Sequence, residues 1–212
     1  LPAFLDPRYL RVESKPIFLV FQPSDLDAAW VNLWQSLARE SCLEGLYLVG
    51  IVKNEQEARR VHALGFDACT ISRTNGRATQ RLGARDTIKR LFGERNARYV
   101  YQNILTQPFD VFDYRKATPF PDLPQELPYD FFPCVMPGWD NTPRSGLNGQ
   151  VYQGSSPELF KQHLRHATDR VQKYAPERQI VIIKSWNEWA EGNYLEPDAR
   201  YGDAFLRAIN QE

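Results

Sequence analysis

The chain has 212 residues, of which 42% are hydrophobic and 13% aromatic, which suits one globular domain or a large piece of one. Lysine plus arginine and aspartate plus glutamate both number 26, so the net charge does not point to nucleic acid or an acidic membrane surface as a partner. No apolar run approaches the ~20 residues of a membrane span, and no signal peptide is visible.

The cysteines and the single methionine give two further expectations. Cys42, Cys69 and Cys134 are odd in number, far apart and free of any CxxC spacing, which favours a reduced compartment over a disulfide framework. The chain starts at Leu1 and its only methionine is Met136, so we expect a section of a longer protein.

The hydrophobic pattern predicts strands that alternate with helices. Apolar runs predict strands at 16–22, 46–52, 66–71, 129–137 and 179–186. Helical spacing of apolar residues, with caps and stops, predicts helices at about 26–37 (after an Asp25 cap), 55–64 (ending at Gly65), 156–174 and 201–210.

This alternation predicts an α/β fold with parallel strands covered on their faces, either a doubly wound sheet or a (β/α)8 TIM barrel. No GxGxxG follows the first strand, which weakens a dinucleotide-binding interpretation. Polar and aromatic clusters follow the strands, where both folds keep their active sites. Only five strands are predicted, so a barrel would lack three.

Two further features of the sequence, a row of basic residues and a pair of histidines, could bind ligands but have simpler explanations. Residues 72–128 are less regular and include a cation at every fourth position, at Arg73, Arg77, Arg81, Arg85 and Lys89. This basic stripe could grip phosphate or an acidic glycan, but a solvated face is the favoured interpretation. His163 and His166 have the spacing of a metal pair on a helix, yet no third ligand is evident, so we expect no metal site.

The segment SWNEWAEG, residues 185–192, carries the residues best suited to catalysis. Glu188 and Glu191 are three apart, so a turn would bring both carboxylates to one face, as a glycosidase acid and its partner require. Trp186 and Trp189 could stack on sugar rings, and Asn187 could bind a hydroxyl. The alternative is structural, since acidic residues favour helix starts and tryptophans after a strand are often core.

The segment MPGWDNTPRSG, residues 136–146, is the second cluster. Pro-Gly, Asp-Asn and Thr-Pro pairs are typical of a tight turn. The functional interpretation is a substrate loop, in which Trp139 stacks on a sugar, Asp140 binds paired hydroxyls and Arg144 supplies a positive charge.

Three segments resemble the glycosyltransferase WbsX family, a glycoside hydrolase family 99-like group. They are residues 185–209, SWNEWAEGNYLEPDARYGDAFLRAI, residues 136–144, MPGWDNTPR, and residues 6–25, DPRYLRVESKPIFLVFQPSD. Between about 72 and 128 the clearest match is FDYRKA, residues 112–117. The resemblance implies the C-terminal portion of a (β/α)8 barrel, strands four to eight, whose missing N-terminal strands would be needed for activity.

The resemblance also implies roles for single residues. The family's endo-α-mannosidase relatives carry an N-E-W-H-E-G pattern, which places the general acid/base at Glu191 and the carboxylate that assists the sugar's 2-hydroxyl at Glu188. Ala190 stands where those mannosidases have histidine. Tyr114 and Tyr194, within matching segments, complete the expected substrate-binding set with the tryptophans, Asp140, Arg144 and Asn187.

The whole sequence therefore predicts one domain over 1–212, incomplete at its N-terminal side, from a retaining glycoside hydrolase or transglycosylase acting on a bacterial polysaccharide. We expect a cytoplasmic location and no metal or organic cofactor. A glycosyltransferase of cell-surface polysaccharide (O-antigen) synthesis and a non-catalytic glycan-binding module remain alternatives.

Overall fold

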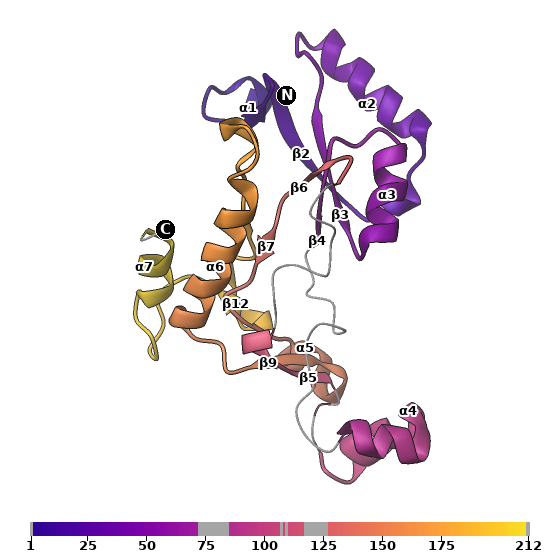
Figure 1. Cartoon of the computed structure of the whole chain (residues 1–212), viewed down its shortest axis with the longest axis vertical. Helices are drawn as coiled ribbons and strands as arrows, with labels where there is room; N and C mark the ends of the chain where they lie inside the picture. Colours follow the sequence, from indigo (N-terminus) through magenta and orange to yellow (C-terminus); the bar gives the residue numbers. More distant parts are fainter. Residues whose placement is uncertain (1, 72–84, 107, 109, 117–126, 211–212) are drawn as a thin grey trace. The chain divides into compact units, whose positions relative to one another are not determined.

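The computed structural model describes residues 2–71, 85–106, 108, 110–116 and 127–210 (Figure 1). The chain divides into two compact units, each assembled from segments far apart in the sequence. The first unit comprises Leu1–Arg73, Asp122–Cys134 and Thr168–Ile182, and the second comprises Thr74–Pro121, Val135–Ala167 and Ile183–Glu212. In the described part of the chain, no helix has the length and apolar character needed to cross a membrane.

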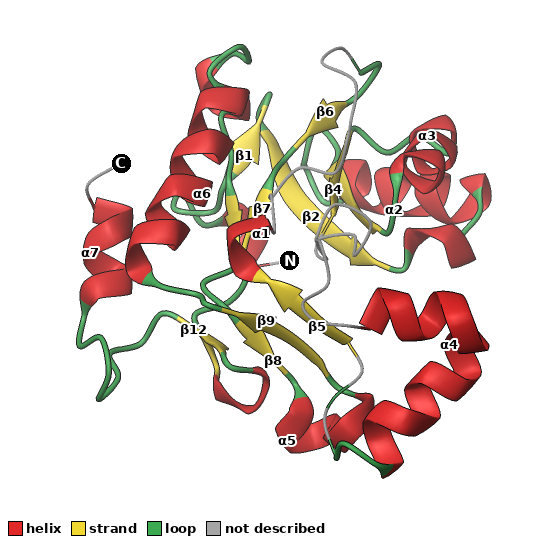
Figure 2. Cartoon of the chain, turned by 60° about the horizontal axis from the view of Figure 1, so that its bottom comes forward, coloured by secondary structure: helices red, strands yellow, loops and turns green. Residues whose placement is uncertain are grey.

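The first unit contains a five-stranded sheet in the order β1-β2-β3-β4-β6. The strands are β1 (Arg11–Val12), β2 (Lys15–Phe21), β3 (Tyr47–Val52), β4 (Ala68–Ile71) and β6 (Asp130–Phe131). Strands β2, β3, β4 and β6 are parallel neighbours, and β1 pairs antiparallel with the start of β2. Helices α2 (Ala28–Glu40) and α3 (Glu55–Ala63) connect consecutive strands and lie on one side of them (Figure 2). The predicted α/β alternation is confirmed here.

The helix ends of the first unit agree only partly with the sequence prediction. Gly65 follows α3 with φ +104, as expected of a glycine that stops a helix. The Asp25 cap is wrong, because Asp27 has the extended backbone of a cap and accepts a hydrogen bond from the Trp30 N–H at 2.9 Å. Asp25 instead ends the 3-10 turn η1 (Pro23–Asp25). The remaining short elements of this unit are α1 (Pro2–Leu5) and η4 (Pro176–Arg178).

The core of the first unit covers part of one sheet face. It contains the buried side chains of Val12, Ile17, Tyr47, Val49, Ala68 and Phe132, with Ile180 and Ile182 packed against them. Leu19 and Phe21 follow Ile17 on the same face of β2 at the period of two, yet they are 45% and 73% exposed. Val20, on the opposite face of β2, is buried.

The two later strands are shorter than predicted. The run 129–137 forms β6 and then β7 (Cys134–Val135), separated by Pro133, which has no N–H to donate to a ladder. Of the run 179–186, only β10 (Ile182–Ile183) is strand. The chain passes between the two units within β7, β10 and the long helix α6 (Pro157–Val171).

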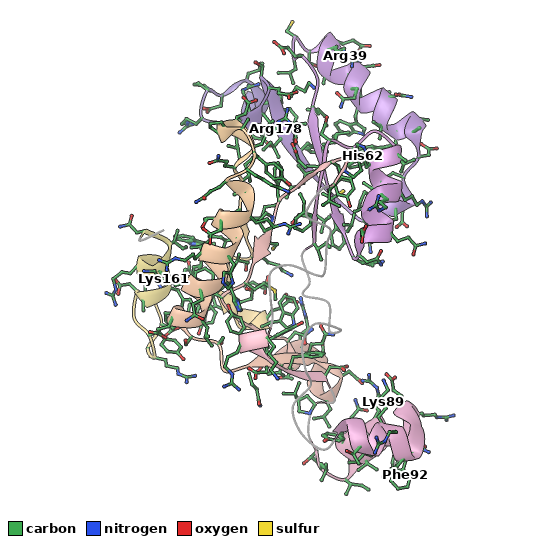
Figure 3. The ribbon with its side chains drawn as sticks, viewed as in Figure 1. Arg39, His62, Lys89, Phe92, Lys161 and Arg178 are labelled. Atoms are coloured by element: carbon green, nitrogen blue, oxygen red, sulfur yellow. The ribbon has the colours of Figure 1, made fainter. Side chains whose placement is uncertain are left out.

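The second unit contains a three-stranded sheet and a small hairpin. The sheet has the order β5-β9-β8, with β5 (Asp110–Asp113), β9 (Gln150–Gln153) and β8 (Trp139–Asp140). Buried Phe112, Tyr114, Met136, Trp139 and Tyr152 form a cluster in this unit. The other elements are α4 (Arg85–Asn103), which carries Lys89 and Phe92 (Figure 3), η2 (Tyr114–Lys116), α5 (Thr142–Ser145), η3 (Gly146–Asn148), β11 (Asn187–Glu188), η5 (Trp189–Glu191), β12 (Asn193–Tyr194) and α7 (Ala204–Asn210).

Candidate functional site

All ten residues predicted for the site belong to the second unit. They come from three segments: Tyr114 directly after β5, residues 139–144 around β8 and α5, and residues 186–194 around the β11–β12 hairpin. The structure brings the second and third segments into contact through α5, β8 and η5.

The hairpin places the two glutamates at either end of one tight turn. β11 and β12 pair antiparallel, with Asn187 opposite Tyr194 and Glu188 opposite Asn193. Between them, Trp189–Glu191 form the 3-10 turn η5, and Gly192 leaves it with φ +55. In a 3-10 turn residues three apart lie one above the other, so Glu188 and Glu191 share the turn that their spacing suggested. That both carboxylates point into one cleft stays a prediction.

Glu191 is buried and forms an ion pair with Arg144. Its residue exposure is only 8%, whereas the Arg144 side chain on α5 is 62% exposed. Arg144 is therefore the counter-ion of Glu191.

Asp140 shapes the loop that presents Arg144. Its Oδ1 accepts hydrogen bonds from the Thr142 N–H at 2.9 Å and the Thr142 hydroxyl at 2.6 Å. These bonds tie the end of β8 to the first residue of α5, as a short acidic side chain commonly does in a turn. The turn interpretation of this segment is thus correct, and Asp140 is half-buried beside it.

Two glycines, which the sequence analysis did not select, hold the two segments together. A Cβ on Gly192 would lie 3.2 Å from the Asp140 backbone nitrogen, and one on Gly138 would lie 2.9 Å from the Gly192 carbonyl oxygen. The backbones therefore approach as closely as only glycine allows. The available signal was the position of each glycine beside a candidate residue, Gly138 before Trp139 and Gly192 after Glu191.

Of the three tryptophans in the candidate site, two are exposed and one is buried. Trp186 is 57% exposed and Trp189 is 47% exposed, so neither is a core residue. Trp189 stacks on Tyr194 with ring centroids 3.7 Å apart, and its Nε1–H donates to Glu196 at 2.6 Å. Trp139 is buried, with the Lys184 ammonium 4.1 Å from its ring centroid. Trp186, Trp189 and the exposed Asn187 thus form the accessible aromatic and amide surface beside the glutamates.

Tyr114 lies beneath the site. It is 1% exposed, and its hydroxyl donates to the Met136 carbonyl at the start of the 136–144 segment. Burial raises the pKa of Tyr114 well above its usual range. The ring centroids of Tyr114 and His163 are 4.8 Å apart. Burial, and to a smaller extent the charge of His166, lowers the pKa of His163 to about 4. In this arrangement Tyr114 supports the loop from inside.

The histidine pair and the described part of the basic stripe have other surroundings than the glutamate turn. His163 is buried and His166 is exposed, and the described residues contain no group of three or more His, Cys, Asp or Glu side chains that could hold a metal ion. Arg73, Arg77 and Arg81 of the basic stripe lie outside the described residues. Lys89, at the end of the stripe, forms an ion pair with Glu94 at 2.7 Å.

A second polar cluster lies in the first unit, around Arg178. Arg178 and His62, which Figure 3 labels, line a cavity of about 360 Å³ together with Tyr129 and other residues. Arg178 pairs with Glu13 and, at 3.5 Å, with Asp130, which also accepts a hydrogen bond from the Tyr47 hydroxyl at 2.5 Å. Tyr47 and Asp130 begin β3 and β6, so this cluster lies at the N-terminal ends of parallel strands, where residues usually serve stability. The glutamate turn is the better candidate.

Comparison with known proteins gives a family and a fold. The family model described as "Glycosyltransferase WbsX" matches residues 1–209. The WxcX proteins of two strains of Xanthomonas campestris pv. campestris, B100 and ATCC 33913, are 31% identical over 211 residues, 97% of this chain. The chain spans only 28% of the length of these relatives.

Solved structures agree on the fold. A glycoside hydrolase-like protein has a TM-score of 0.60 at 16% identity, over 99% of this chain and 57% of that chain. The GH99 endo-α-mannosidase from Bacteroides thetaiotaomicron has a TM-score of 0.55 at 16% identity, over 96% of this chain and 56% of that chain. At this identity the likeness is evidence of the fold alone, an α/β fold related to TIM-barrel GH99 proteins.

Proposed function

Because the chain belongs to the glycosyltransferase WbsX family, we propose that it forms part of a carbohydrate-active enzyme that cleaves or transfers glycosidic bonds of a bacterial polysaccharide. The observation that carries the proposal is the η5 turn, where Glu188 and Glu191 flank Trp189 next to exposed Trp186. Carboxyl groups beside flat apolar rings suit a bond between sugars, because the rings bind the sugar faces while the carboxyl groups move protons.

In the proposed reaction, the two glutamates have different roles. Glu191 gives a proton to the leaving glycosidic oxygen, while the Glu188 carboxylate takes the proton of the sugar's 2-hydroxyl as that oxygen attacks the anomeric carbon. In the second step Glu191 takes a proton from water, or from an acceptor hydroxyl, which attacks the same carbon, and Glu188 returns its proton to the 2-oxygen. The product keeps the original anomeric configuration.

We expect Arg144 to release Glu191 during this cycle. The two side chains form an ion pair, whereas proton transfer requires the glycosidic oxygen to reach the Glu191 carboxyl group. The Arg144 side chain is 62% exposed, so the guanidinium has room to turn toward solvent or toward the glycan.

We also propose that the strands of this chain correspond to strands four to eight of a barrel completed by other parts of a longer protein. The exposed Leu19 and Phe21 support this, since they continue a sheet face whose other residues are buried. In a closed barrel, that face is filled by side chains from the remaining strands.

The test uses the full-length protein and a panel of methylumbelliferyl and dinitrophenyl disaccharides. Glu188→Gln and Glu191→Gln should each reduce turnover by about 10²–10⁴-fold. The Glu191 variant should be less impaired on dinitrophenyl substrates, whose leaving group needs no proton. Glu158→Gln, an exposed glutamate at the start of α6, is the matched control and should be unaffected.

Two other results would redirect the proposal. Turnover only with a nucleotide-sugar donor would favour the transferase that the family description names. Tight binding of oligosaccharides without turnover by the unmodified protein would favour a glycan-binding module built on Trp186 and Trp189.

A further inference from the structure

Asn193 is a fully buried polar residue whose amide has no visible purpose in the unliganded fold. It is 0% exposed, and within the described part of the chain neither its side-chain nitrogen nor its side-chain oxygen has a hydrogen-bond partner. Its backbone carbonyl accepts a hydrogen bond from the Ser185 hydroxyl at 2.7 Å. An unpaired buried amide destabilises a fold, so such groups are rare and call for an explanation.

The hairpin register places Asn193 beside one of the two glutamates. Asn193 lies directly opposite Glu188 in the β11–β12 pair, whereas Asn187 and Tyr194 form the neighbouring pair. Residues directly opposite in an antiparallel pair have Cβ atoms about 4.5–5.5 Å apart and project from the same face. An amide and a carboxylate at that separation can form a hydrogen bond by rotating their side chains.

The surrounding backbone keeps this pairing in register. Gly192 precedes Asn193, packs against Asp140 and places its carbonyl oxygen close to Gly138. The Ser185 bond holds Asn193 to the chain that leads into β11. Asn193 is therefore fixed by its backbone while its side-chain amide remains available.

We propose that Asn193 is a positioning residue for Glu188: in the substrate-bound site its side-chain N–H donates to the Glu188 carboxylate and orients one oxygen toward the sugar. The inference rests on the proposed function, because it assumes that Glu188 assists the reaction. Glu188 is half-buried, so water solvates its carboxylate in the empty site. A bound glycan displaces that water, and a neutral amide donor then replaces it without adding a charge that would compete with Arg144.

The competing explanation is a structural water that bonds the amide and is unrelated to Glu188. The two explanations differ in what happens when the amide is replaced by an apolar side chain of similar size. A positioning residue is unsatisfied in the empty fold, so its loss leaves stability unchanged or increased and lowers turnover. A residue satisfied by structural water supports the fold, so its loss lowers stability, and any loss of turnover follows from that.

The experiment is a double-mutant cycle in the full-length protein, using the methylumbelliferyl disaccharide that the unmodified protein cleaves fastest. Asn193→Leu should lower kcat by about 10- to 100-fold, with KM changed less than threefold, because a misplaced carboxylate slows chemistry more than binding. Its melting temperature should equal or exceed that of the unmodified protein. In the Glu188→Gln background, Asn193→Leu should have almost no further effect on kcat, since the group that it positions is already gone.

A second variant separates the donor from the shape of the side chain. Asn193→Asp keeps the shape but removes the N–H donors and repels Glu188, so its kcat should fall at least as far as that of Asn193→Leu. Full additivity with Glu188→Gln, or a lowered melting temperature with unchanged kcat at low temperature, would overturn the positioning role. If Glu188→Gln is impaired but Asn193→Leu is not, only this inference fails, whereas normal turnover of Glu188→Gln would end the proposed function as well.

Discussion

Strand β3 in the first unit and the β11–β12 hairpin in the second place very different residues in the interior. In β3 every residue except Ile51 is buried, and all are apolar or aromatic. In the segment from Asn187 to Tyr194, the buried side chains are those of Glu191 and Asn193. The parallel strands are stabilised by removal of apolar surface from water, whereas the hairpin is positioned by an ion pair, a hydroxyl bond and glycine-mediated backbone contact.

The difference shows which region is optimised for stability and which is not. Burying a carboxylate and an unpaired amide is unfavourable unless something else compensates. The hairpin bears both and lies against Asp140 and α5, so its conformation depends on that neighbouring segment. The hairpin thus buries polar groups at an energetic cost, as is common where a protein carries out chemistry.

The largest expected effect tests the apolar side of the comparison. Phe132→Ala should destabilise the chain by about 3–5 kcal/mol, because Phe132 is 1% exposed and stacks on Tyr47 within the core of the first unit. Phe21→Ala, at 73% exposure, is the matched control and should change the free energy of unfolding by less than about 0.5 kcal/mol in residues 1–212 alone. Urea unfolding measures both.

The same pair of variants sharpens the proposal of an incomplete barrel. In the full-length protein, Phe21→Ala should lower the free energy of unfolding by more than about 1 kcal/mol, as expected for the loss of a partly buried aromatic side chain. An equally small effect in both proteins would show that nothing covers Phe21.

The next effect concerns pH and belongs to the core of the second unit. Burial lowers the pKa of His163 from 6.5 to about 4, so between these values the unfolded chain binds a proton that the folded chain does not. Stability is then complete above pH 6.5 and falls with decreasing pH down to about pH 4, by up to about 3 kcal/mol. Unfolding measured above pH 6.5 and near pH 4 should show a smaller loss for His163→Leu. His166→Leu should keep most of the loss, because burial is the larger cause of the low His163 pKa and the charge of His166 the smaller one. Equal pH dependence of all three proteins would contradict the assignment.

A smaller effect separates two glycines with the same backbone angle. Gly192 and Gly202 have φ +55 and +54, but only Gly192 has neighbours within 4 Å of an added Cβ. Gly202→Ala should lower the free energy of unfolding by about 1 kcal/mol, because alanine disfavours the left-handed backbone conformation. Gly192→Ala should cost about 1 kcal/mol more through crowding against Asp140, and should also lower turnover by displacing Glu191. Equal losses for the two variants would mean that the hairpin and the 138–140 backbone are not held in contact.

The smallest effect tests whether the Arg144–Glu191 pair supports stability. Arg144→Gln should lower the free energy of unfolding by less than about 1 kcal/mol, because the arginine side chain is mostly exposed and solvent screens the pair. Arg178→Gln should be more harmful, since Arg178 is 35% exposed and contacts two carboxylates. Thermal melts at low and high salt would compare the stability losses of the two variants. A larger loss for Arg144→Gln than for Arg178→Gln would contradict this prediction.

The elements predicted correctly are those whose own side chains carry the pattern. Strands β2, β3 and β4 and helices α2 and α3 combine a clear period with local stops such as Gly65, so each was recognisable from about ten residues. Strands β5, β8 and β9 were missed because they lie outside long apolar runs and exist through pairing with one another. Strand β4 is equally short, but it belongs to the run 66–71 directly after the helix stop at Gly65, which made it recognisable.

Within the candidate site, residue chemistry identified some members and missed others. Glu188 and Glu191 were recognisable from their spacing, and Trp186 and Trp189 from their flanking positions. Asn193, Gly138 and Gly192 were missed because asparagine and glycine are ordinary turn residues, and only their burial and close contacts distinguish them here. Tyr114 was selected from its segment, and its burial under Met136 could not be read from neighbours in the sequence.

The α/β alternation, the family and the location of the acidic turn could be read from neighbouring residues, because periodicity and motif spacing are local properties. The pairing of Arg144 with Glu191, the bonds of Asp140 to α5 and the burial of Asn193 opposite Glu188 became apparent in the folded chain alone. These relations join segments separated by a turn or by tens of residues. They depend on distance and burial, which arise when backbone pairing and close packing bring those segments together.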